Sequence, residues 1–325
     1  MPALMAPSEL AQRVLAGDRS ALARAITLAQ DGGEAGRELI RELYPSTGHA
    51  SVVGVTGPPG AGKSTVIGAL IARRRSAGAT VGVLSVDPTS PFSGGAVLGD
   101  RIRLAEHFLD PGVFIRSMGS RGQAGGLAAS SLQTLLLLGA AGKDVVFLET
   151  VGAGQGEVSV RSLTDLVLLV LMPGSGDSVQ ALKAGIMEIP DLIALNKADL
   201  PGAEATAKEL RGALSIGAGG APTLLLCDSL SREGTAELWE LIEARLGAAR
   251  ADGGLARRRA ARLQREVLAV ASARAGRYLE NAVDADPELQ ALLEEVAHGR
   301  LDPLSAVHEV LRKVFAIDED DSHTR

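Results

Sequence analysis

Blocks of apolar residues alternate with longer mixed stretches along most of the chain. The apolar blocks are short and rich in Val, Ile and Leu, and the mixed stretches repeat apolar residues at helical spacing. The blocks predict strands at 52–56, 80–86, 112–116, 144–149, 165–171, 192–195 and 222–226, and the mixed stretches predict helices near 63–77, 100–109, 125–141, 177–188, 203–214 and 233–247. Short strands separated by helices indicate βαβ units, so we expect an α/β fold with a mostly parallel sheet flanked by helices.

Both ends of the chain lack strand-like blocks and predict helices only. The N-terminal helices, within residues 8–44, have packing against the main domain as their expected role. After Arg250, Asp286-Pro287 and Asp302-Pro303 each indicate a helix start, and an apolar stripe near Leu263 to Tyr278 would pack on its own domain or on a second copy. We therefore expect an N-terminal helical segment at 1–48, a central domain at 49–250 and a C-terminal helical segment at 251–325.

Composition narrows the classes of function. The 325 residues carry a net charge of −6 with both signs mixed along the chain, which argues against a nucleic-acid binder. Cys227 is the single cysteine, so no intrachain disulfide forms and a reducing compartment fits. The first residues do not resemble a signal peptide, and the apolar runs are too short to cross a bilayer. We expect a cytoplasmic protein without a membrane partner.

The stretch after the first predicted strand has the pattern G-x-x-x-x-G-K-[ST]. Its glycines let backbone N–H groups surround phosphate oxygens, and the following helix directs its positive dipole end at the same anion. Lys63 would reach the β- and γ-phosphates, and Ser64 would bind Mg²⁺. The alternative is a glycine-rich turn that matches by chance. The predicted nucleotide-binding residues here are Gly57, Pro58, Pro59, Gly60, Ala61, Gly62, Lys63, Ser64 and Thr65.

A second motif, N-K-x-D at 196–199, follows the apolar run 192–195. The Asp199 carboxylate can accept two hydrogen bonds from guanine, whereas adenine offers neither donor on that edge. The Lys197 stem can lie over the base, and Asn196 belongs to the same motif. Ser229 and Leu230, after the last predicted strand, are expected to form a further base-contacting turn. We therefore predict guanine specificity, with a polar surface loop as the alternative.

Two further predicted strands are each followed by, or end in, an acidic residue. Asp87 could hold Mg²⁺ or orient the attacking water, with a helix cap or Asx turn as the alternative. Glu149 is followed three residues later by Gly152, which is the D-x-x-G arrangement of GTPases with Glu in place of Asp. Asp100, in a glycine-rich loop, could join the metal shell or be a solvated loop charge. Gln155 stands too far from Gly152 to be assigned as the water-positioning glutamine.

Three longer stretches resemble one family, the methylmalonyl-CoA mutase-associated GTPases of the MeaB/ArgK type. They are E-T-V-G-A-G-Q at 149–155, the D-P-T-S to G-D-R segment at 87–101, and P-G-S-G-D-S-V-Q-A-L-K-A-G-I at 173–186. The resemblance covers essentially the whole chain. It implies a P-loop NTPase fold and a GTPase chaperone that gates cofactor delivery to an adenosylcobalamin-dependent acyl-CoA mutase and protects or reactivates that mutase.

The resemblance also implies a homodimer joined through the C-terminal helices, and a functional lysine, Lys183, in an extra switch at 176–185. Here the switch contains D-S-V-Q at 177–180 where many relatives have Glu-Leu in the middle, and Gly156 stands where serine is common. These departures leave open which mutase is the partner.

The predicted reaction converts GTP and water to GDP and phosphate. Its candidate catalytic residues are Lys63, Asp87, Asp100, Glu149 and Lys183, and its candidate Mg²⁺ ligands are Ser64, Asp87, Asp100 and Glu149. Without an evident arginine finger, hydrolysis should be slow until the mutase binds. One alternative is a nickel-inserting GTPase of hydrogenase or urease maturation, although the five histidines are scattered. Another is a kinase of a transport protein, which would prefer ATP.

Overall fold

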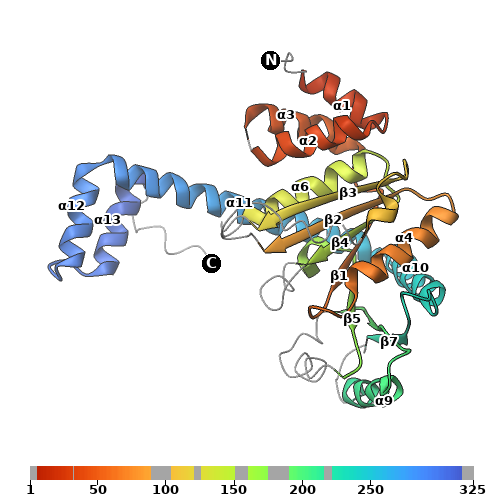
Figure 1. The fold of residues 1–325 in the computed structure, drawn as a ribbon. Coiled ribbons are helices and arrows are strands. Elements are labelled where there is room, and N and C mark those ends of the chain that lie inside the picture. Colours follow the sequence, from red (N-terminus) through yellow and green to blue (C-terminus); the bar gives the residue numbers. More distant parts are fainter. Residues whose placement is uncertain are drawn as a thin grey trace. The chain divides into compact units, whose positions relative to one another are not determined.

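The computed structural model describes residues 6–31, 33–88, 104–120, 126–150, 160–174, 190–215 and 222–316. Its centre is a parallel sheet in which seven strands follow the order β3-β2-β4-β1-β5-β6-β7 (Figure 1). The strands are β1 (Ser51–Thr56), β2 (Val81–Pro88), β3 (Val113–Ser120), β4 (Val145–Thr150), β5 (Leu166–Leu171), β6 (Leu192–Leu195) and β7 (Thr223–Leu226). The predicted α/β fold with a parallel sheet flanked by helices is confirmed.

Two strands are longer than the apolar pattern predicts. β2 and β3 pair in register from Val81 and Val113 to Pro88 and Ser120, well past the predicted ends at 86 and 116. The extra residues include Asp87, and apart from the buried Met118 they are polar residues, proline or glycine, so a search for apolar runs stops before them. Backbone pairing between neighbouring strands, rather than burial of side chains, defines these strand ends.

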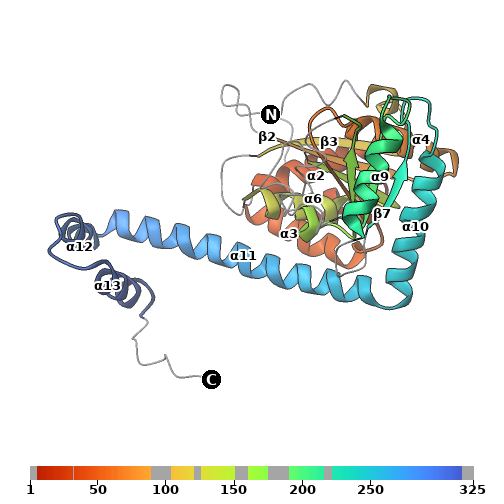
Figure 2. The same ribbon diagram turned by 90° about the horizontal axis from the view of Figure 1, so that it is seen from below.

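Alternate residues of the strands face two different apolar layers. On one face, Val52, Leu84 and Leu148 pack with α6 (Gly126–Ala140) and with the N-terminal helices. On the other face, Val53 and Phe147 pack with α4 (Lys63–Ser76) and α10 (Thr235–Ala251). Figure 2 shows these two helices from below. Burial on both faces explains why the strands read as continuous apolar runs.

The N-terminal helices belong to the first of these layers. They are α1 (Pro7–Leu15), α2 (Arg19–Asp31) and α3 (Glu34–Leu43), followed by a short 3-10 turn, η1 (Tyr44–Ser46). Ile26, Leu39 and Leu43 are fully buried or nearly so, in one cluster with Leu138 of α6. The expected packing of residues 8–44 against the main domain is confirmed.

The structure bears differently on each of the remaining helix predictions. α9 (Ala203–Leu214) is present and packs on β5, β6 and β7. Where a helix is predicted near 100–109, the described part contains only a 3-10 turn, η2 (Ala105–His107), and Asp110-Pro111 then leads into β3. The helix predicted near 177–188 lies outside the described residues.

The chain divides into two compact units, Met1–Gln264 and Arg265–Arg325, and the division falls within α11 (Gly254–Ala285). In the second unit, α12 (Pro287–Ala297) and α13 (Pro303–Phe315) begin where predicted, because the Asp286 and Asp302 carboxylates accept hydrogen bonds from the first backbone N–H groups of each helix. The segment boundaries at 48/49 and 250/251 stay predictions. No helix in the described ranges is both long and apolar enough to cross a bilayer.

Candidate functional site

The loop between β1 and α4 is a tight turn built on glycines with positive φ. Gly57, Gly60 and Gly62 have φ angles of 141°, 79° and 91°. A Cβ atom on Gly57 would lie 2.1 Å from the carbonyl oxygen of Val170, and one on Gly62 would lie 2.3 Å from Nδ2 of Asn196. The loop is therefore pressed against the carboxyl ends of β5 and β6, so glycine is needed for packing as well as for open access to phosphate.

Lys63, the first residue of α4, lies over this loop. The side chain is only 7% exposed, and Nζ donates hydrogen bonds to the carbonyl oxygens of Gly57 at 2.8 Å and Pro58 at 3.1 Å. The loop's own backbone thus holds the ammonium group within the loop. The free backbone N–H groups at the start of α4 add positive potential at the same place.

Glu149 at the end of β4 connects the loop with two strands. Its carboxylate is 1% exposed and accepts a hydrogen bond from Ser64 Oγ at 2.7 Å. The other oxygen accepts from Ser85 Oγ on β2 at 3.3 Å, because Ser85 and Glu149 are register partners. The structure therefore brings the predicted ligands Ser64 and Glu149 together.

Ser85 is a site residue that sequence reasoning missed. The sequence could have identified it, because Ser85 lies two residues before Asp87 and the two side chains are therefore on the same face of the strand. Asp87 itself is in the extended part of β2, where its Cα pairs with that of Gly119. The predicted site residues Asp100, Gly152 and Lys183, and the unassigned Gln155, lie outside the described residues.

Asn196 connects the loop after β6 with the phosphate loop. It is 1% exposed, and Nδ2 donates to the carbonyl oxygen of Ala61 at 2.9 Å. Its Oδ1 accepts from the backbone N–H of Ser229 at 3.0 Å and lies 3.9 Å from Sγ of Cys227. Burial, and then the neighbouring Asp228, raise the pKa of Cys227 to about 12, so this group is a neutral thiol.

The other base-site predictions lie nearer the surface. Lys197 adopts a left-handed backbone with φ 59°, and its Nζ is 3.6 Å from Sδ of Met172 at the end of β5. Asp199 is exposed, and Leu230 is 82% exposed in a turn whose N–H groups are held by the Asp228 carboxylate. Asn196 and Ser229 are thus in direct contact, whereas the side chains of Asp199 and Leu230 are exposed.

Together these groups line the carboxyl edge of the sheet from β2 to β7. One end offers glycine-rich backbone, a lysine and two oxygen-bearing side chains, which suit a polyphosphate and a hard cation. The other end offers an exposed carboxylate beside a lysine stem, which suits a purine with two donors on one edge. The chemistry that this arrangement supports is nucleoside-triphosphate binding and hydrolysis.

Comparisons with known proteins agree with this site. The family model described as "Methylmalonyl Co-A mutase-associated GTPase MeaB" matches residues 22–284. A protein of Pyrococcus abyssi named as a GTPase is 44% identical over 313 residues, covering 94% of this chain and 96% of that protein. The GTPase ArgK of Escherichia coli is 36% identical over 249 residues, covering 72% of this chain and 74% of that protein.

A solved structure titled LAO/AO transport system kinase also matches, with a TM-score of 0.70 and 27% identity over 96% of this chain and 100% of that one. The family match spans the phosphate loop, both serine–glutamate contacts and the Asn196 contacts. The resemblance found in the sequence is therefore confirmed, and the chain belongs to the family of methylmalonyl-CoA mutase-associated GTPases, the MeaB family.

Proposed function

We propose that this protein is a Mg²⁺-dependent GTPase that acts as the chaperone of an adenosylcobalamin-dependent acyl-CoA mutase. In this role it gates cofactor loading and protects or reactivates the mutase. The family description supports the link to a mutase. The observation that carries the switching role is the 2.7 Å hydrogen bond from Ser64 to Glu149. It joins the phosphate-binding helix to the strand end from which residues 151–159 continue, so a change at the phosphates acts directly on that strand end.

The residues at the loop fit a magnesium ion. Ser64 supplies a hydroxyl and Glu149 a buried carboxylate, and oxygen donors of this kind are what Mg²⁺ prefers. Asp87 at the end of β2 and Asp100 are the further proposed ligands. When bound, the ion would neutralise charge on the β- and γ-phosphates.

The chain's own residues account for the other requirements of hydrolysis. Lys63 and the loop N–H groups hold the phosphates, while Asp199 and Lys197 select and cover guanine. Gly152 would sense the γ-phosphate, and Lys183 would connect the reaction to the mutase. Binding of the mutase completes a site that is slow on its own, as trans-acting groups do in other GTPases.

We further propose a cytoplasmic homodimer formed through the C-terminal helices. Val267 and Leu268 are each 68% exposed and Tyr278 is 59% exposed on α11, which is costly for large apolar side chains unless a second copy covers them. Neither nucleic acid nor a membrane is a proposed partner. The segments at 1–48, 49–250 and 251–325 remain the proposed organisation.

The test measures GTP turnover with and without purified adenosylcobalamin-dependent mutases, including those acting on methylmalonyl-CoA and isobutyryl-CoA. We expect one mutase to raise turnover at least about tenfold, because a trans-acting partner supplies groups that the isolated site lacks. Ser64→Ala protein and an acyl-CoA enzyme without cobalamin are the controls. Equal turnover with every mutase would contradict the chaperone role. Tight stoichiometric nickel binding would favour the metal-insertion alternative, and transfer of γ-phosphate to a protein would favour the kinase alternative.

A further inference from the structure

The lysine of the N-K-x-D motif combines an uncommon backbone conformation with a specific side-chain contact. Lys197 has a positive φ of 59°, which is unfavourable for residues other than glycine because Cβ then crowds the backbone. Its Nζ lies 3.6 Å from Sδ of Met172, and the described residues offer this ammonium group no carboxylate partner. Backbone strain of this kind persists where the surrounding structure holds it, and it concentrates at binding sites. The Lys197 side chain is therefore held in one direction by its backbone and by Met172.

Strand order shows where this direction leads. β5, which ends next to Met172, lies between β1 and β6 in the sheet. The phosphate loop follows β1 and Lys197 follows β6, so the Lys197 side chain runs over the end of β5 toward the phosphate loop. It therefore extends from the base half of the proposed nucleotide site toward its phosphate half.

Met172 also adjoins the phosphate loop. A Cβ atom on Gly60 would lie 3.8 Å from Cε of Met172, which is an ordinary van der Waals distance. Met172 is half-buried, and the residues on both sides of it, Leu171 and Pro173, are buried, so its place in the fold is well fixed. One flexible side chain thus lies beside the phosphate loop and contacts the lysine that follows β6.

A thioether suits this place better than a hydrocarbon side chain. Its sulfur is a weak hydrogen-bond acceptor, so an ammonium group can lie against it at less cost than against a purely apolar surface. A lysine side chain without such a partner has many rotamers, and nucleotide binding would have to select one of them. A contact that holds the chain beforehand lowers that entropic cost of binding.

We infer that Met172 is a positioning residue for nucleotide binding, which holds Lys197 extended over the end of β5 so that the lysine stem is in place to cover the base. The inference rests on the proposed guanine site. Because Met172 acts through a residue that binds the base, it should change the affinity for nucleotide and leave the rate at saturating GTP almost unchanged.

The test is calorimetric titration of the full-length protein with GDP and Mg²⁺, together with kcat and KM for GTP. Met172→Leu keeps a similar volume but removes the acceptor, and Met172→Gln restores an acceptor on a side chain of similar length. Met172→Leu is also combined with Lys197→Ala. Met118→Leu is the matched control, because Sδ of Met118 likewise accepts a hydrogen bond, from Thr134 Oγ1 at 3.5 Å, but on the edge strand β3.

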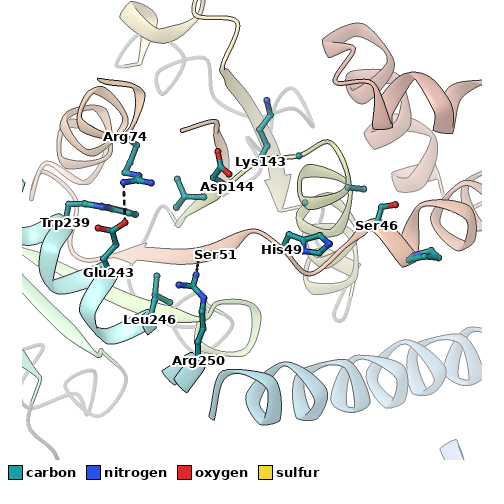
Figure 3. A pocket seen from close by; sticks show the side chains of 15 residues that line it. Ser46, His49, Ser51, Arg74, Lys143, Asp144, Trp239, Glu243, Leu246 and Arg250 are labelled. Atoms are coloured by element: carbon teal, nitrogen blue, oxygen red, sulfur yellow. Dashed lines mark hydrogen bonds and ion pairs between the residues drawn. The ribbon is translucent and has the colours of Figure 1, made fainter. Parts of the chain in front are cut away.

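A second control lies at the edge of the sheet where the strands begin. Ser51 and Val145, at the starts of β1 and β4, line a cavity there that also contains the 3.3 Å ion pair of Arg74 with Glu243 (Figure 3). Glu243→Gln removes this ion pair at the end of the strands opposite to the nucleotide site. It therefore reports what a distant structural change does to GDP affinity, and both controls should bind GDP as the wild type does.

We expect Met172→Leu to weaken GDP affinity and raise KM about fivefold, with kcat within about twofold of the wild type. Met172→Gln should bind GDP within about twofold of the wild type, and Met172→Leu should add no loss to that of Lys197→Ala. Unchanged or increased affinity of Met172→Leu, equal losses in both Met172 variants, or a full further loss in the Lys197→Ala protein would each overturn the positioning role.

Lys197→Ala alone separates this inference from the site on which it rests. If Lys197→Ala weakens GDP affinity and the Met172 variants do not, the positioning role fails and the proposed base site stands. If Lys197→Ala leaves GDP affinity unchanged, the proposed role of Lys197 and the positioning role fail together.

Discussion

The side-chain amide of Asn196 donates a 2.9 Å hydrogen bond to the carbonyl oxygen of Ala61, and thereby ties the loop after β6 to the middle of the phosphate loop. The same amide accepts from the backbone of Ser229, so one buried side chain organises three loops. The two halves of the nucleotide site, one for phosphate and one for the base, are therefore mechanically connected before any nucleotide binds.

Asn196→Ala should weaken both folding and nucleotide binding. The substitution leaves the Ala61 carbonyl and the Ser229 N–H without partners, at about 1–3 kcal/mol for each group. We expect a stability loss of about 2 kcal/mol or more in urea unfolding, and GDP affinity lowered at least about tenfold. Asn281→Ala is the control, because Asn281 is exposed on α11. Wild-type GDP affinity in Asn196→Ala would contradict the connection.

Ser64→Ala should impair GTP hydrolysis more than Ser85→Ala does. Ser64 is both a proposed Mg²⁺ ligand and the closer partner of Glu149, at 2.7 Å against 3.3 Å for Ser85. We expect Ser64→Ala to lower GTP turnover at least about a hundredfold at saturating Mg²⁺. Ser85→Ala should raise the Mg²⁺ concentration needed for half-maximal turnover about tenfold, because it only orients the carboxylate.

GTP turnover measured at increasing Mg²⁺ concentrations tests both the loss expected for Ser64→Ala and the higher Mg²⁺ requirement expected for Ser85→Ala. Ser76→Ala, at the far end of α4, should match the wild type. Equal Mg²⁺ dependence of Ser85→Ala and wild type would show that Ser85 does not position Glu149.

Gly57→Ala and Gly212→Ala should change stability in opposite directions. At Gly57 the new Cβ would lie 2.1 Å from the Val170 carbonyl oxygen, and the φ angle of 141° is strained for alanine. We expect a loss of about 3 kcal/mol. Gly212 is at an exposed position of α9 with nothing within 4 Å of a Cβ, so alanine there should add about 0.5–1 kcal/mol. Thermal melts test both, and a neutral Gly57→Ala would contradict the close loop packing.

Asp199→Ala should remove the preference for guanine. The exposed carboxylate is free to accept from the two donors of guanine, and adenine offers neither. We expect GTP affinity to fall about a hundredfold while ATP affinity stays the same, measured by calorimetry with both nucleotides. Asp284→Ala on α11 serves as the control. If the substitution left the ratio of the two affinities unchanged, Asp199 would not be the base-selecting residue.

Cys227 should make stability fall at alkaline pH. Burial and Asp228 raise the pKa of its thiol from an ordinary value near 9 to about 12 in the folded protein. Well below pH 9 the thiol is neutral in both states, so it adds no pH dependence there. Between pH 9 and 12 only the unfolded chain ionises, so the folded state loses stability as pH rises.

Unfolding free energies of wild type and Cys227→Ala between pH 7 and 11 test this, and the wild-type value should fall more steeply above about pH 9. In the native protein near pH 8, the buried thiol should also resist a thiol reagent that labels the urea-unfolded chain. Rapid labelling of the native protein would contradict the buried neutral thiol.

Much of the fold was predictable because its signals are local. Each strand is an apolar run buried on both faces, and the helix starts at Asp286 and Asp302 need only a capping carboxylate and the proline after it. The phosphate loop likewise needs only its own glycines, lysine and serine. The strand ends past residues 86 and 116 were missed because their pairing, not their side chains, extends them.

The sequence by itself therefore determined the α/β architecture, the phosphate loop and the family. Only the tertiary structure decided which distant groups meet: Ser85 with Glu149, and Asn196 with Ala61. Strand order and register make these contacts, because they place residues 64 and 135 positions apart at hydrogen-bond distance. No local pattern encodes such pairings, since each partner's own neighbourhood reads as an ordinary strand end or loop.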